Sequence, residues 1–157
     1  MSVVVYWLGM QLYALLARVA ALFKPKAKKF IQGRKDLQQH IHYSLIDEKR
    51  SRIWMHCASL GEFEQGRPVL EKLRRNYSNH AIVVTFFSPS GYELRKNYSG
   101  ADYVFYLPLD SPYNAHEFMA SVKPKLAIFV KYGLWYFYLS KMANACLLYT
   151  SPSPRDS

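Results

Sequence analysis

Glu62 is the side chain of this 157-residue sequence with the clearest capacity for chemistry. It closes the run "HCASLGE", in which small residues and a glycine lead from an apolar stretch straight into a helical pattern. The helix dipole favours an ionised carboxylate in the first turn by about 0.3–1 kcal/mol. Because a general base must be ionised before it accepts a proton, Glu62 is a candidate catalytic base. The local pattern alone favours the simpler interpretation, an acid that only stabilises its own helix.

Four apolar runs, each followed by turn residues and a helical stretch, must position this carboxylate. The apolar runs cover 52–59, 81–87, 101–110 and 125–130, and the helical stretches cover 62–77, 88–98, 111–124 and 131–142. Short strands without alternation, separated by helices, predict a parallel sheet covered on both faces, which is a Rossmann-like α/β unit. Ligands bind such sheets beyond the carboxyl ends of the strands. We therefore expect "CASLGE", "FFSPSG", "YLPLD" and "VKYGLW" to form one functional edge.

Local signals refine these helices. Ser88 and Ser90 are most simply cap residues, with Pro89 at the first helical position, and Asp110 belongs to the turn before Ser111 and Pro112. For the stretch 62–77 we expect an inner face that comprises Phe63, Val69, Leu70, Leu73 and Tyr77.

Residues 1–24 are predicted to form a membrane-anchor helix. Between Val3 and Phe23 only Gln11 and Arg18 are strongly polar, and they lie seven apart, on one helical face. A helix of this length is about 31 Å long, close to the thickness of the bilayer hydrocarbon. The pattern permits either a marginal span or a helix in the membrane interface. A secretory signal peptide is disfavoured because the basic residues follow the apolar run.

Residues 25–50 are predicted to be a basic juxtamembrane segment with one short amphipathic helix, on which Leu37, Ile41 and Leu45 share a face. The net charge of the chain is +10, and residues 1–52 contribute +7 of it. We expect Lys24, Lys26, Lys28 and Lys29 to contact anionic lipids or phosphates on the cytoplasmic side. Nucleic-acid binding is disfavoured because no aromatic residues are interleaved with this basic run.

The order and spacing of "HCASLGE", "TFFSPSGYE", "YLPLDSP" and "KPKLAIFVKYGLW" behind such a helix resemble the acceptor-side half of bacterial 3-deoxy-D-manno-octulosonic acid (Kdo) transferases. The resemblance spans nearly all of residues 1–145, and the abundance of Tyr and Phe is similar to that of Bacteroidetes members. It implies the N-terminal half of a GT-B fold, in which two Rossmann-like domains face a cleft. It also implies an inverting glycosyltransferase at the bacterial inner (plasma) membrane, with its catalytic domain on the cytoplasmic side.

The resemblance implies roles for individual residues. CMP-Kdo would be the donor and a lipid A precursor the acceptor in lipopolysaccharide biosynthesis, with no cofactor and no metal. Glu62 matches the family's catalytic base, Ser59 and Gly61 match the turn around it, and the second edge loop, with Ser88, Ser90 and Gly91, would line the acceptor side. The Rossmann-like acceptor-side domain would cover residues 51–145.

The sequence departs from the family at two places. The family usually carries a glutamate two residues before the tryptophan of the fourth edge segment, where this chain has Gly133. Residues 146–157 have no family counterpart, and Cys146 to Ser151 match a translated frame of a common sequencing adapter, so we expect an artefactual tail outside the fold. The donor-binding domain would then be absent, and we expect this chain alone not to transfer Kdo. Two alternatives stay open: another membrane-associated GT-B glycosyltransferase, and a membrane-tethered α/β binding module without catalysis.

Overall fold

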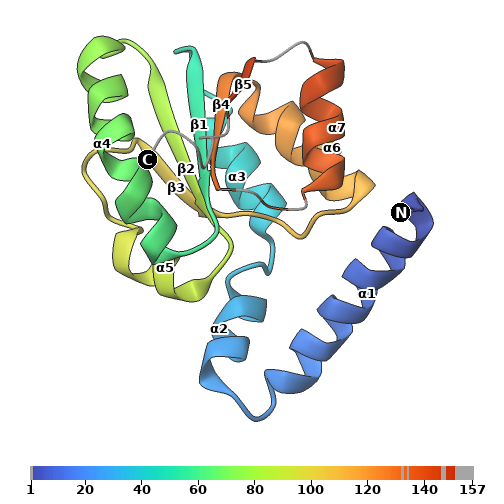
Figure 1. The fold of residues 1–157 in the computed structure, drawn as a ribbon. Coiled ribbons are helices and arrows are strands. Elements are labelled where there is room, and N and C mark those ends of the chain that lie inside the picture. The colour runs from blue at the N-terminus through green and yellow to red at the C-terminus, as the bar shows by residue number, and fades with distance from the viewer. Residues whose placement is uncertain (1, 132, 134, 146–147, 151–157) are drawn as a thin grey trace.

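The chain folds around a five-stranded parallel sheet with the strand order β3-β2-β1-β4-β5 (Figure 1). A computed structural model describes residues 2–131, 133, 135–145 and 148–150. The strands are β1 (Arg52–Cys57), β2 (Ala81–Phe86), β3 (Tyr103–Tyr106), β4 (Pro124–Val130) and β5 (Leu148–Thr150). Each of the four predicted strands is thus confirmed, although β4 begins at Pro124, one residue before the expected run. Residues 146–157 were expected outside the fold, but residues 148–150 form β5, which pairs in parallel with β4.

Helices cover both faces of the sheet, as the absence of alternation predicted. On one face lie α4 (Leu60–Asn76) and α5 (Pro89–Arg95); on the other lie α3 (Leu37–Leu45), α6 (Pro112–Val122) and α7 (Tyr136–Asn144) (Figure 1). Each face has its own apolar core. Trp54 is fully buried in the core on the α6 side, and Phe63 is fully buried in the core beneath α4.

The inner face of α4 differs from the expected one. Phe63 and Leu70 are buried, but Val69 and Tyr77 are 49% and 45% exposed, so their predicted burial was wrong. The buried strip instead includes Gly66, where an added Cβ would lie 2.7 Å from Val130 Cγ2. Because Gly66 has no side chain, α4 approaches β4 closely at this residue. The buried face of α4 therefore runs along Phe63, Gly66 and Leu70, and Val69 and Tyr77 lie outside it.

The N-terminal segment forms two helices that lie against the carboxyl edge of the sheet, which we define as the loops that follow the strands. The first is α1 (Val3–Ala20), the expected apolar helix (Figure 1). The second is α2 (Pro25–Gln32), a helix with proline at its start that lies within the expected basic segment. The hydroxyl of Tyr6 on α1 donates a hydrogen bond of 2.6 Å to Asp110 Oδ2. This apolar helix is therefore attached to the domain.

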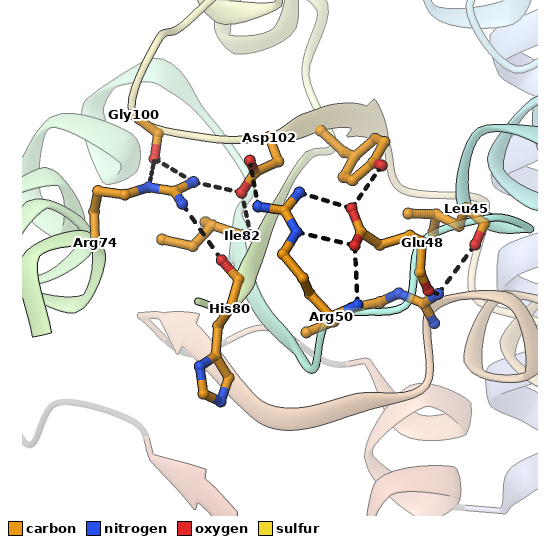
Figure 2. Close-up of polar contacts among 10 residues, drawn as sticks. Leu45, Glu48, Arg50, Arg74, His80, Ile82, Gly100 and Asp102 are labelled. Atoms are coloured by element: carbon orange, nitrogen blue, oxygen red, sulfur yellow. Dashed lines mark hydrogen bonds and ion pairs between the residues drawn. The ribbon is translucent and has the colours of Figure 1, made fainter. Parts of the chain in front are cut away.

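A network of charges closes the opposite, amino edge of the sheet. Arg50 bonds both Glu48 and Asp102, and Asp102 also pairs with Arg74 on α4 (Figure 2). The bonds from Arg50 hold the pKa of Glu48 at about 2, well below its ordinary value. Arg50 is therefore engaged within the fold, and the positive charge that the N-terminal third presents to solvent comes mainly from its lysines.

Candidate acceptor site at the carboxyl edge

The turn between β1 and α4 holds Glu62 where ligands bind to sheets of this kind. From β1 the chain adds β2 and β3 on one side of the sheet, and it then adds β4 and β5 on the other side. The switch point of this parallel sheet therefore lies between β1 and β4, and its crevice opens beside the residues that follow Cys57 and Val130. Ser59 is the N-cap of α4, with extended backbone, and its hydroxyl accepts a hydrogen bond from the Glu62 N–H at 3.4 Å. The sequence Ser-x-x-Glu thus places Glu62 in the first turn, as predicted.

The carboxylate of Glu62 is anchored through one oxygen. Glu62 Oε2 accepts a hydrogen bond of 2.6 Å from the Ala58 N–H, and the side chain is half-buried. Among the described residues, no hydrogen bond involves Glu62 Oε1. Burial and the charge of Glu62 raise the pKa of the neighbouring Cys57 thiol well above its ordinary value. Glu62 therefore has a fixed orientation and one oxygen without a bond to the described chain, while Cys57 stays an unreactive thiol.

The loop between β2 and α5 packs directly against this turn. The Ser88 N–H donates to the Ala58 carbonyl at 2.8 Å, so the backbone of Ala58 links Glu62 through its N–H to Ser88 through its C=O. Ser88 is the N-cap of α5, as expected, and its hydroxyl lies 2.8 Å from that of the exposed Ser90. The structure thus brings Ser59, Glu62, Ser88 and Ser90 to one edge.

The two glycines of the predicted site have different surroundings. Gly91 is buried, and an added Cβ would lie 2.3 Å from the Phe86 ring and 3.2 Å from the Leu60 nitrogen. Its lack of a side chain lets the two loops pack together, and its contact with the acceptor stays a prediction. Gly61 is exposed, and an added Cβ would meet only Ser59 Oγ at 4.0 Å. The space beside Glu62 is therefore open, and because φ of Gly61 is not positive, a side chain at this position would not strain the backbone.

Two grooves connect the basic helix α2 to the serines of the edge. One, of about 520 Å³, runs between α1, α2 and the β2–α5 loop and is lined by Lys24, Lys26 and Ser88. Its neighbour, of about 320 Å³, is lined by Lys26, Lys29 and Ser90. All of these lysines, and Lys28, are exposed, and none forms an ion pair with any described carboxylate. The predicted phosphate contacts thus lie beside the predicted acceptor residues.

Arg34, which the sequence analysis did not single out, holds this edge together. Its Nε donates to the Leu107 carbonyl at 3.0 Å and one terminal nitrogen to the Phe87 carbonyl at 2.9 Å. Its guanidinium also stacks 3.8 Å from the centre of the Phe30 ring. Burial lowers the pKa of Arg34 to about 10, and within the described ranges no carboxylate pairs with it. Arg34 ties α2 to the ends of β2 and β3, a long-range contact that its position in a basic run does not reveal.

Gly133 lies beside Trp135, in the segment where the family usually carries a glutamate. An added Cβ at Gly133 would lie 2.0 Å from the Trp135 indole nitrogen. The indole packs 4.8 Å from the His56 ring and 5.1 Å from the Phe87 ring. The indole of Trp135 therefore occupies the space in which a side chain at position 133 would begin. No cluster of three or more possible metal ligands occurs among the residues that the structure describes.

Comparison with known proteins decides the family. The family model for 3-deoxy-D-manno-octulosonic-acid transferase (kdotransferase) matches residues 11–148. The chain belongs to this family. The resemblance read from the edge motifs is thereby confirmed, and the parallel sheet with helices on both faces matches the fold expected of the N-terminal half of a GT-B protein.

Individual relatives agree with this family. The chain is 36% identical over 84 residues to a 3-deoxy-D-manno-octulosonic acid transferase of Haemophilus influenzae, which covers 53% of this chain and 20% of the relative. For the Aquifex aeolicus enzyme of the same name, identity is 38% over 87 residues, or 55% of this chain and 24% of the relative. A bifunctional glycosyltransferase/methyltransferase of Fusobacterium nucleatum is 33% identical over 79% of this chain. The chain therefore spans only about a fifth to a quarter of these curated relatives.

Proposed function

We propose that this chain is the acceptor-side half of a transferase that moves Kdo from CMP-Kdo to a lipid A precursor. The single observation that carries the proposal is the half-buried Glu62 carboxylate at the carboxyl edge, anchored through Oε2 with Oε1 unbonded to the described residues. Family membership supports the reaction class. The work would take place at the bacterial inner (plasma) membrane, with the catalytic domain on the cytoplasmic side and CMP-Kdo held mainly by a second domain.

The proposed step is an inverting displacement in which Glu62 is the general base. Glu62 Oε1 takes the proton of a sugar hydroxyl on the acceptor, and that oxygen forms a bond to the anomeric carbon of Kdo. The bond from that carbon to the phosphate oxygen of CMP breaks, and CMP leaves with the electron pair. The Ala58 N–H fixes the carboxylate during this step, because it already bonds Oε2. The open space beside Gly61 gives the acceptor hydroxyl a path to the base.

The acceptor would approach from the grooves beside α2. A lipid A precursor carries phosphate groups, and Lys24, Lys26 and Lys29 line these grooves without a described carboxylate to neutralise them. Exposed positive side chains attract phosphate over distances of about a Debye length, ~8–10 Å at ordinary ionic strength. Ser88 and Ser90 at the ends of the grooves would supply hydroxyl groups to the sugar.

Binding of a lipid A precursor by this chain tests the acceptor assignment. Vesicles of neutral lipid would carry either the bisphosphorylated precursor or its dephosphorylated form. We expect the chain to bind the phosphorylated form more tightly and Lys26→Gln to remove most of that preference. Lys72→Gln is the matched control, because Lys72 is an exposed lysine on α4. Equal binding to both forms, or equal effects of the two substitutions, would refute the acceptor assignment.

One observation favours a second candidate, a membrane-tethered binding module. The bond between the Ala58 N–H and Glu62 gives the carboxylate a structural role that needs no catalysis. The effect of Glu62→Gln on turnover separates this candidate from the transferase, since only the transferase needs the ionisable oxygen.

A further inference from the structure

Helix α1 carries two opposite strips with different surroundings. One strip is partly or fully buried against the rest of the chain and comprises Tyr6, Met10, Ala14, Ala17 and Ala20. The other is apolar, with each side chain 50–62% exposed, and comprises Val4, Val5, Leu8, Leu12, Leu15, Leu16 and Val19. At about 100° per residue the two strips face opposite directions on the helix. One side of α1 is therefore docked, and the other has no partner in the described structure.

The docked side of α1 contacts the carboxyl edge at two places. Near its start, Tyr6 bonds the fully buried Asp110, and its ring lies 5.8 Å from that of Phe137. Further along, the ring of Tyr13 lies 5.9 Å from that of Phe30 and 6.1 Å from that of Phe87. From Tyr6 to Ala20 the helix extends for about 21 Å at ~1.5 Å per residue. These contacts tie α1 to the β3–α6 loop near its start and to the β2–α5 loop near its middle. Figure 1 shows α1 running from the loops beside α6 and α7 down to α2.

This docking is incompatible with α1 crossing a bilayer. The helix has the length and hydropathy of a membrane span. If it crossed, however, the β3–α6 loop with Asp110 and the β2–α5 loop with Ser88 would lie at the depth of the hydrocarbon. Loops with polar backbone exposed to lipid do not occur there, because their N–H and C=O groups would lack partners. We propose that α1 lies in the plane of the membrane, with its exposed strip in the acyl chains of one leaflet.

The charges next to α1 also fit contact with a phospholipid leaflet. Lys24, Lys26, Lys28 and Lys29 follow the helix directly and are exposed, without an ion pair in the described part of the chain. Lysines near a membrane surface each contribute about 1 kcal/mol of attraction to anionic headgroups. Leu22 and Phe23, 78% and 80% exposed, extend the apolar surface up to these lysines. An apolar strip flanked by a basic segment is the pattern of an interfacial helix on a phospholipid leaflet.

The side of the membrane that Ser2 reaches tests this inference. The chain would carry Cys146→Ser, leaving only Cys57, which is fully buried, and one new cysteine, either Ser2→Cys or Ser78→Cys. Ser2 precedes α1, and Ser78 is an exposed residue between α4 and β2, at the amino edge. A membrane-impermeant maleimide would then be applied to spheroplasts and to inverted membrane vesicles.

We expect both cysteines to be labelled from the same side of the membrane, because an in-plane helix keeps both ends there. Labelling of Ser2→Cys only from the side opposite to Ser78→Cys would show a span and overturn the inference. Labelling from neither side until detergent is added would place the N-terminus inside the bilayer and also overturn it. The result does not depend on Kdo transfer, so a failure here leaves the proposed reaction untouched.

Discussion

Acidification should destabilise this protein through His56, which is held neutral inside the fold. The side chain is 2% exposed, its Nδ1 lies 2.9 Å from Thr85 Oγ1, and its Nε2 has no hydrogen-bond partner among the described residues. Burial first, and then the positive charge of Arg34, lower the pKa of His56 to about 3. A drop from pH 7 to pH 5, which spans the ordinary pKa of a histidine, should therefore destabilise the fold.

The sign and size follow from proton linkage. An unfolded chain titrates this histidine near 6.5, whereas the folded chain does so near 3. The stability that the neutral ring contributes is fully present above pH 6.5 and is lost as the pH falls towards 3. Between pH 7 and pH 5 the unfolded state gains about 0.7 of a proton, whereas the folded state gains almost none. The free energy of unfolding should therefore fall by about 2 kcal/mol, since each pH unit is worth ~1.4 kcal/mol per proton.

Urea unfolding in a mild detergent at the two pH values measures this loss, with fluorescence of the buried Trp54 as one reporter. In His56→Gln the loss between pH 7 and pH 5 should be smaller by about 2 kcal/mol, whatever the stability of the variant at pH 7. In His42→Gln it should persist, because His42 is exposed. If the wild type and His56→Gln lost the same amount, a neutral, buried His56 would be refuted.

Three further outcomes are expected. Gly91→Ala should lower the free energy of unfolding by about 1–3 kcal/mol, because its Cβ would enter the Phe86 ring. Gly61→Ala should change it by less than about 1 kcal/mol, and equal losses for the two variants in urea unfolding would contradict the packing role of Gly91. Ser59→Ala should cost about 1 kcal/mol through the lost cap, and an unchanged stability would mean that the 3.4 Å bond contributes nothing. Leu12→Lys, on the exposed strip of α1, should weaken flotation with anionic vesicles about tenfold or more, since burying a leucine contributes about 1.5–3 kcal/mol. The same change at Ser78 should not weaken it, and equal flotation of the two variants would contradict a lipid contact through this strip.

The elements of the fold could be predicted because their signals are local. Apolar runs without alternation specify buried parallel strands, and the caps at Ser88 and Ser111 start α5 and α6 as the sequence indicates. The position of Glu62 followed in the same way, because the Ser-x-x-Glu pattern contains both its helix and its hydrogen bond to Ser59.

The remaining features depend on contacts between distant parts of the chain. Asp110 was expected only in a local turn, but its carboxylate accepts bonds from the Phe137 and Tyr138 N–H groups at the start of α7, and from Tyr6. Nothing in the sequence distinguishes Arg34 from the lysines near it, yet it bonds the ends of β2 and β3. Gly91 matched a family loop, and only the ring of Phe86 shows that its task is packing. No local pattern carries the pairings of Asp110 and Arg34, because those partners lie between 27 and 104 residues away.

The measurement that tests the central claim most directly is the turnover of Glu62→Gln. The substitution would be made in an active full-length transferase that contains this segment. Glutamine keeps the size of the side chain and an oxygen for the Ala58 N–H, but it cannot accept the acceptor's proton. Under saturating CMP-Kdo and lipid A precursor, we predict a loss of rate of about 10²–10⁴-fold, the usual contribution of a general base, with acceptor binding unchanged. Turnover close to the wild-type rate would contradict the assignment of Glu62 as the base.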